Sequence, residues 1–130
     1  MENKKFDENV VKNIEKLSEL NNYGQENIEE YYDKVATAYE DTMITMGHPD
    51  PHHCGEAAVE LITGAGKAVA DAKCLDMGCG TGLVGVELHK RGFPDIVGVD
   101  ASEGMLESAK EKNAYTELQH LFLGKPDTYP

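Results

Sequence analysis

The most constraining feature of the sequence is a run in which glycine occupies every second position. The segment 74–82, Cys-Leu-Asp-Met-Gly-Cys-Gly-Thr-Gly, begins with apolar residues and leads into a stretch with the apolar spacing of a helix. Glycine permits the positive φ of a tight turn, and its missing Cβ lets a ligand approach the backbone. The run therefore predicts a strand that turns sharply into a helix beside a ligand, with Gly78, Gly80 and Gly82 in the turn.

An acidic residue follows the glycine run at the spacing expected of a nucleoside site. A second apolar segment, 96–99, is closed by Asp100, which lies 18 residues beyond Gly82. An acid at a strand end, about 20 residues after such a turn, can bind the two hydroxyls of a ribose. The turn, helix, strand and acid together predict a nucleoside-binding site with Asp100 on the ribose.

The second half of the chain alternates predicted strands and helices. The predicted elements are strands at 74–77, 96–99 and 121–123 and helices at 83–91 and 103–113. Gly92 is the expected left-handed stop of the first helix and Ser102 the cap of the second. This alternation is typical of right-handed β-α-β units, which form a parallel sheet with ligands at the carboxyl ends of its strands.

The first half of the chain is predicted to be helical. Apolar residues three or four positions apart predict helices at 7–20, 28–46 and 56–62. Pro49 and Pro51 interrupt the pattern, because proline lacks an amide donor and restricts the residue before it. We therefore expect a loop from His48 to Cys54. The expected fold class is α/β, with N-terminal helices followed by the first half of a doubly wound Rossmann-like parallel sheet.

Length and charge narrow the possible functions. A chain of 130 residues fits one domain, in which we expect residues 1–72 to form an N-terminal helical segment and 73–130 the cofactor-binding half. The net charge of −12 repels phosphate backbones and anionic lipid heads, so a nucleic-acid partner is disfavoured. No stretch is long and apolar enough to span a bilayer, and three cysteines favour reduced thiols, so we expect a cytoplasmic or nuclear protein.

Two segments resemble a known family, the class I S-adenosylmethionine-dependent methyltransferases. Residues 75–82, Leu-Asp-Met-Gly-Cys-Gly-Thr-Gly, resemble their first motif, and 98–106, Gly-Val-Asp-Ala-Ser-Glu-Gly-Met-Leu, resemble the second strand and next helix of the methyl-type branch. More narrowly, 80–84, 91–93 and 104–107 are similar to methyltransferase-like proteins of the Williams–Beuren syndrome region. The resemblance extends over 30–124 and implies a Rossmann-like methyltransferase domain with S-adenosylmethionine as its cofactor.

The resemblance also implies which residues contact the cofactor. Gly78, Gly80 and Gly82 would form the cofactor loop. Asp76 would lie near the methionine amine, and Asp100 would bind the ribose hydroxyls. S-adenosylmethionine has no phosphate, so an acid at Asp76 is acceptable beside its ammonium and sulfonium. The same acid would repel a pyrophosphate.

The resemblance implies further contacts with the cofactor, and each of these residues also has a purely structural interpretation. Ala101, Ser102 and Met105 would face the adenine, but they equally suit capping and core packing. Cys79 lies within the loop beside a helix N-terminus, where a thiol pKa can be lowered, but it also suits a tight space as a small residue. Many members of the family carry an acid soon after the third strand. Here Gly124 is followed by Lys125, which leaves Asp127 as the substitute.

Two other groups of residues have less specific patterns. Residues 30–39 resemble the helix that partly covers the cofactor cleft in many of these enzymes, where Tyr32 and Tyr39 could meet the sulfonium or simply pack. Four potential metal ligands lie close together in the sequence: His48, His52, His53 and Cys54. They lack the paired spacing that closes a tetrahedral site, so no metal is predicted.

Alternative functions remain open at this stage. Residues 80–85 also satisfy the Gly-x-Gly-x-x-Gly pattern of NAD(P)-dependent Rossmann oxidoreductases, although Asp76 and Gly78 precede the first glycine of that pattern. A non-catalytic protein that keeps the cofactor fold is a third possibility. No catalytic base is apparent, and the acceptor, a small molecule or a protein, is unknown. Because the family has seven strands, we expect residues 1–130 to be the N-terminal part of a longer methyltransferase or a truncated form without activity of its own. These residues alone should bind cofactor weakly and lack activity.

Overall fold

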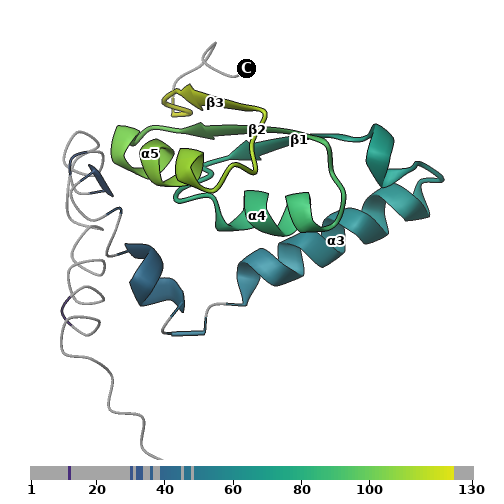
Figure 1. Ribbon diagram of the computed structural model, residues 1–130, viewed down its shortest axis with the longest axis horizontal. Helices are drawn as coiled ribbons and strands as arrows, with labels where there is room; N and C mark the ends of the chain where they lie inside the picture. The colour runs from purple at the N-terminus through teal and green to yellow at the C-terminus, as the bar shows by residue number, and fades with distance from the viewer. Residues whose placement is uncertain are drawn as a thin grey trace, which may run out of the picture.

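The computed structural model describes residues 12, 30, 32, 33, 36, 39–44, 46, 47 and 49–124. Its elements are α3 (Asp50–Gly64), the short 3-10 helix η2 (Val69–Asp71), β1 (Lys73–Met77), α4 (Leu83–Lys90), β2 (Asp95–Asp100), α5 (Glu103–Glu111) and β3 (Glu117–His120), as Figure 1 shows. Helical residues before α3 include 32, 33, 36 and 39–44, within the predicted helix 28–46. The predicted helix 7–20 lies outside the described residues except for Lys12.

The three strands form one parallel sheet in the order β1-β2-β3. Asp76 of β1 pairs with Gly98 of β2, and Asp100 at the end of β2 pairs with His120 of β3. Figure 1 shows α3, α4 and α5 on the same side of the sheet. For α4 and α5 the reason is that each connects adjacent parallel strands and the two crossovers run in the same direction across the sheet. The expected α/β class is therefore confirmed as part of a Rossmann-like parallel sheet.

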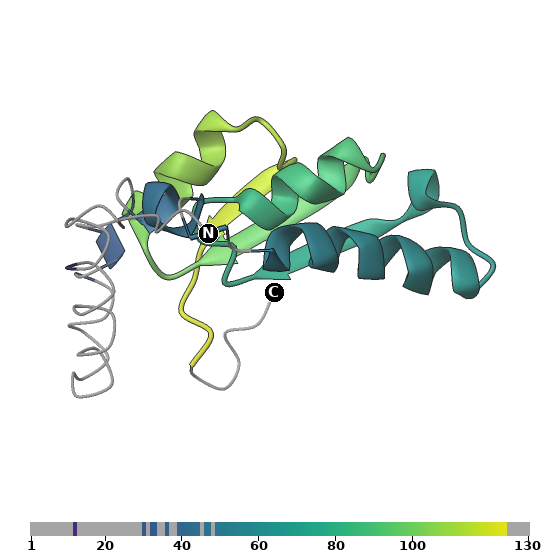
Figure 2. The same ribbon diagram turned by 90° about the horizontal axis from the view of Figure 1, so that it is seen from below.

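The core lies between this sheet and its helices. Its buried centre consists of Leu88 of α4, Ile96 of β2, and Phe93 from the loop between these two elements. Apolar residues of α3 pack against these three side chains. In Figure 2 α3 and α4 run side by side across the sheet. The helix α3, which belongs to the predicted N-terminal segment, thus shares one core with the strands. The boundary at residue 72 stays a prediction.

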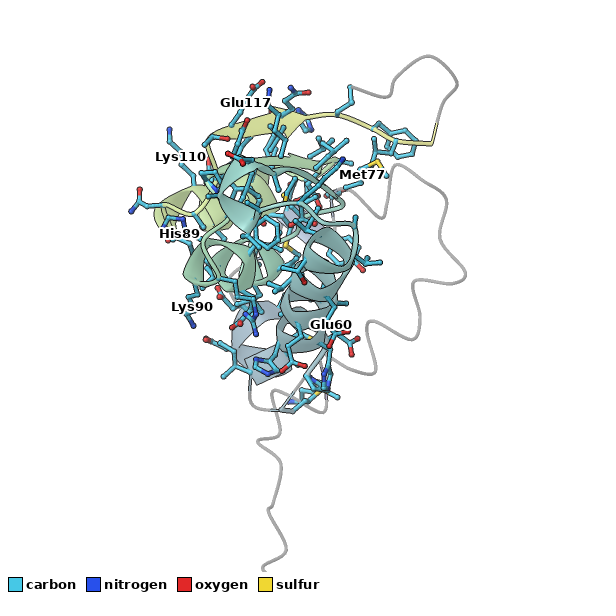
Figure 3. The ribbon with its side chains drawn as sticks, turned by 90° about the vertical axis from the view of Figure 1, so that its right-hand side faces the viewer. Glu60, Met77, His89, Lys90, Lys110 and Glu117 are labelled. Carbon is cyan, nitrogen blue, oxygen red and sulfur yellow. The ribbon has the colours of Figure 1, made fainter. Side chains whose placement is uncertain are left out.

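The other face of β1 carries large apolar side chains that are exposed. Leu75 is 48% exposed and Met77 is 56% exposed. Figure 3 shows Met77 on the opposite side of the molecule from His89 and Lys90 of α4. Within the described part of the chain, no strand pairs with the outer edge of β1. The described elements thus leave the outer edge and this face of β1 uncovered.

Two local predictions were wrong. The expected loop from His48 to Cys54 is replaced at residue 50 by α3, in which a proline occupies the first turn. Proline is tolerated there, since a first-turn amide has no partner within the helix. The third strand is Glu117–His120 rather than 121–123, because the backbone ladder that begins at Val97 and Glu117 ends where β2 ends, at Asp100 and His120.

Other local predictions are confirmed. The helix α4 begins directly after the glycine turn, and Gly92 follows it with a φ of 92°. The Ser102 hydroxyl caps α5 by accepting a hydrogen bond from the amide of Met105 at 3.1 Å. These features place the start of both crossover helices at the same edge of the sheet, where β1 and β2 end.

Candidate functional site

The glycine turn leaves the carboxyl end of β1 with three residues in a left-handed conformation. The φ angles are 74° at Gly78, 56° at Gly80 and 91° at Gly82, which residues with a Cβ rarely adopt. The amides of Gly78 and Cys79 both donate to the carbonyl of Val99, at 2.7 and 2.9 Å. The turn is thus fixed to the end of β2, as the glycine pattern predicts.

Asp100 is held between this turn and the start of α5. Its Oδ2 accepts a hydrogen bond from the amide of Gly80, and its Oδ1 accepts one from the amide of Ser102, both at 2.9 Å. Each carboxylate oxygen has a second lone pair available. The side chain is therefore oriented at the carboxyl end of β2 and can still accept hydrogen bonds from a ligand.

A cavity of about 420 Å³ opens above the turn. Its lining residues are Tyr32, Tyr39, Gly78, Gly80, Asp100, Ala101, Met105, Leu121, Phe122, Leu123 and Gly124. The structure thus brings five of the nine predicted contact residues together on one wall, along with both tyrosines of the N-terminal segment. The cavity combines one carboxylate with aromatic and aliphatic side chains.

Four predicted contact residues lie close to the cavity without lining it: Asp76, Cys79, Gly82 and Ser102. Ser102 is 2% exposed and serves as the cap of α5. A Cβ on Gly82 would lie 3.0 Å from the ring of Tyr115 and 3.1 Å from Ala109, so this glycine permits a close approach inside the fold. The structure shows these two residues supporting the turn and α5 rather than forming a wall of the cavity.

Residues 121–124 are the part of the cavity wall that the sequence did not predict. They follow β3 directly, and the amide of Leu121 donates to the carbonyl of Asp100 at 3.0 Å. The apolar run 121–123 indicated a strand by composition alone. The sequence signal that could have placed this run at the cavity is its position after a parallel strand, because ligands bind at the carboxyl ends of such strands. The predicted acid Asp127 lies outside the described residues.

A half-buried pair beneath the turn, Asp76 and Tyr115, was also not predicted. The Tyr115 hydroxyl donates to Asp76 Oδ2 at 2.7 Å and accepts from the amide of Gly85 at 3.2 Å. Burial raises the pKa of the Asp76 carboxyl, and the nearby Asp100 charge raises it further, whereas the Tyr115 hydrogen bond lowers it. Burial also raises the pKa of the Tyr115 hydroxyl, which keeps it protonated as a donor.

Substitutions of Asp76 should separate hydrogen bonding from charge. Asp76→Ala removes the acceptor of the half-buried Tyr115 hydroxyl, and we expect it to lower the free energy of unfolding by about 1–3 kcal/mol. Asp76→Asn keeps an acceptor oxygen and should lose less. Because the pKa of Asp76 is raised in the fold, wild-type stability should decrease as pH rises through that pKa, and Asp76→Asn should remove this component. Urea unfolding at several pH values measures both effects, and equal stability of all three proteins would contradict the assignment.

Cys79 is not an activated thiol. It is 7% exposed, and burial, followed by the Asp76 and Asp100 charges, raises its pKa to about 12. The alternative of a lowered pKa beside the helix N-terminus is therefore wrong, because burial and two neighbouring carboxylates oppose the thiolate. Cys79 fills a tight space in the turn.

Cys54 and Cys79 should differ in their rates of alkylation. At pH 8 we expect iodoacetamide to modify the exposed Cys54 readily and to leave Cys79 unmodified in the folded protein. Peptide mass spectrometry measures the rates, and unfolding in urea should abolish the difference. Equal labelling of both residues in the folded protein would contradict the burial of Cys79.

The histidines of α3 form a surface cluster with acidic and basic neighbours. His52 Nε2 lies 2.7 Å from Glu56 Oε1, and its Nδ1 lies 3.1 Å from the Arg91 guanidinium. His48 lies outside the described residues. Within the described ranges, no group of three or more histidine, cysteine, aspartate or glutamate side chains is arranged to hold a metal ion, and no helix has the length and apolar character to cross a membrane.

Comparison with known proteins yields two matches. Residues 74–125 match a family described as "Methyltransferase domain". Over 95 residues, or 73% of its length, the chain is 35% identical to a Homo sapiens protein named "Methyltransferase-like protein 27". The matched residues are only 38% of that relative, so the chain spans well under half of its length. The family match, over 74–125, includes the glycine turn, β2 and α5.

Proposed function

We propose that this chain, whose residues 74–125 belong to the methyltransferase domain family, binds S-adenosylmethionine in the cavity above the glycine turn and takes part in transfer of its methyl group. The observation that carries the proposal is Asp100. Its two oxygens are oriented by the amides of Gly80 and Ser102 at the cavity wall, where a carboxylate can accept hydrogen bonds from both ribose hydroxyls.

The residues around the cavity fit the chemical parts of this cofactor. A Cβ added to Gly78 or Gly80 would meet nothing within 4 Å, so the space above the turn is open to a ligand. Phe122 and Leu123, which are half-buried, provide apolar surface for an adenine ring, and the buried Met105 lies behind that surface. The cofactor carries no phosphate, and its cationic ammonium and sulfonium suit a site with Asp100 on its wall and Asp76 beneath it.

The chain's own residues would orient the bound cofactor. When bound, S-adenosylmethionine supplies a methyl group on a cationic sulfur. Asp100 and the glycine turn would hold the nucleoside, and the rings of Tyr32 and Tyr39 would attract the cation through their faces. Such positioning accelerates methyl transfer by holding donor and acceptor in line. No described residue is assigned as a general base, and the acceptor stays open.

The first experiment is a pair of titrations on the whole chain. We expect calorimetry to detect binding of S-adenosylhomocysteine and no binding of NAD. Heat with NAD and none with S-adenosylhomocysteine would replace this proposal with the oxidoreductase alternative. Asp76 opposes that alternative, because it lies near the end of β1, just before the glycine turn, where its charge would repel a pyrophosphate.

A second measurement addresses the non-catalytic alternative. Labelled S-adenosylmethionine is incubated with the chain and with candidate acceptors, and transfer of label is followed. Transfer of label to any acceptor would exclude a non-catalytic protein. Cofactor binding without transfer is the expected result both for such a protein and for these residues as part of a longer enzyme. A cytoplasmic location stays a prediction, which microscopy of the tagged protein would test.

A further inference from the structure

Two of the cavity-lining residues come from a segment far from the sheet in sequence. We name the helical residues 32, 33, 36 and 39–44 the covering segment. It contributes Tyr32 and Tyr39 to the cavity, and their rings lie edge to face with centroids 5.9 Å apart. Figure 2 shows part of the covering segment beside α5. An acidic residue follows each of these tyrosines, Asp33 and Glu40, and neither acid lines the cavity.

Asp33 attaches the covering segment to the start of α5. Its Oδ1 accepts hydrogen bonds from the Ser102 hydroxyl at 2.6 Å and from the amide of Gly104 at 3.0 Å. A Cβ on Gly104 would lie 2.7 Å from the carbonyl oxygen of Asp33, so the two backbones are in close contact. The Ser102 hydroxyl, followed by the Gly104 amide, lowers the pKa of Asp33, so the side chain is a carboxylate at neutral pH.

Ser102 links Asp33 to Asp100, the acid that we assign to the ribose. The backbone amide of Ser102 donates to Asp100 Oδ1, while its hydroxyl donates to Asp33. Ser102 is 2% exposed and Asp33 is an exposed residue, so the Ser102 end of each bond is shielded from water. The position of Asp33 is therefore linked to the turn that orients Asp100.

Glu40 attaches the covering segment to the other end of α5. Its Oε2 lies 2.9 Å from Lys112 Nζ, and the same ammonium donates to the carbonyl of Thr81 at 2.5 Å. Thr81 lies within the glycine turn. The side chains of Glu40 and Lys112 are only 22% and 18% exposed, so this ion pair is less screened than a surface pair.

We propose that Asp33 and Glu40 are positioning residues that hold Tyr32 and Tyr39 over the bound cofactor and slow its release. The inference rests on the proposed function. Each acid is the neighbour of one tyrosine, and their seven-residue separation corresponds to about two helical turns, so both can face α5. One acid binds at the N-terminus of α5 and the other at Lys112 after its last residue. The covering segment is thus fixed at two points, and rotation about either single contact is prevented.

The test is the dissociation rate of S-adenosylhomocysteine, measured by surface plasmon resonance on the 130-residue chain. Asp33→Ala and Glu40→Ala should each raise this rate about tenfold, the change expected from loss of one charged hydrogen bond. Asp33→Asn should restore most of the wild-type rate, because its amide oxygen still accepts from Ser102 and Gly104. Asp41→Ala is the matched control, since Asp41 is an exposed acid of the same segment, and its rate should be unchanged.

Each outcome decides between defined alternatives. Wild-type dissociation rates in folded Asp33→Ala and Glu40→Ala would overturn the inference. Faster release in Asp41→Ala as well would indicate a general charge effect and would also overturn it. If Asp33→Ala fails to fold, Glu40→Ala decides, because Lys112 keeps its bond to Thr81 in that variant. A wild-type chain that binds no S-adenosylhomocysteine would overturn the proposed function itself, which separates that failure from failure of the two positioning residues.

Discussion

Asp100→Ala is expected to weaken binding of S-adenosylhomocysteine by about 1.5–3 kcal/mol, or about 10- to 150-fold in affinity. The variant removes the carboxylate that we assign to the ribose. It also leaves the amides of Gly80 and Ser102 without their acceptor, so the turn that lines the cavity loses two contacts. Titration calorimetry measures the change in affinity.

Two further variants make this result specific. Asp100→Asn keeps an acceptor oxygen beside the turn but loses the charge, so it should lie between the wild type and Asp100→Ala. Asp95→Ala removes an acid at the opposite end of β2, away from the cavity, and should bind with unchanged affinity. Wild-type affinity in a folded Asp100→Ala protein would contradict the assignment of the ribose site.

Gly85→Ala is expected to lower the free energy of unfolding by about 3 kcal/mol or more, because overpacking and the loss of a partly buried hydrogen bond act together. A Cβ at this position would lie 2.2 Å from Cζ of Tyr115 and 2.5 Å from its hydroxyl oxygen. Tyr115 would have to move, and its bond to Asp76 would break. Helix propensity alone predicts the opposite, since alanine is favoured over glycine in a helix by about 1 kcal/mol.

Gly64→Ala provides the matched control for that experiment. Gly64 is the last residue of α3, and a Cβ there would meet nothing within 4 Å. Its stability in urea should stay within about 0.5 kcal/mol of the wild type. Combining Gly85→Ala with Tyr115→Leu should cost little more than Tyr115→Leu alone, since the smaller side chain removes the clash. Wild-type stability of Gly85→Ala would contradict the described packing of Tyr115.

The local features of the fold could be predicted because their causes lie within a few residues. The glycine turn depends on φ angles, and Ser102 caps α5 through an amide three residues later. The errors also have local sources. Pro51 was interpreted as a helix breaker although the first turn of a helix accepts proline, and the apolar run 121–123 was interpreted as a strand although the ladder with β2 ends at His120.

By itself, the sequence determined the alternation of strands and helices, the glycine turn and the position of Asp100 at a strand end, since spacing and glycine conformation specify these. Only the tertiary structure showed that Tyr115 packs against the glycines and binds Asp76, 39 residues away. It alone joined Asp33 to Ser102, 69 residues away, and placed residues 121–124 at the cavity. Such contacts depend on how separate elements pack, and no periodicity or spacing in the sequence encodes that packing directly.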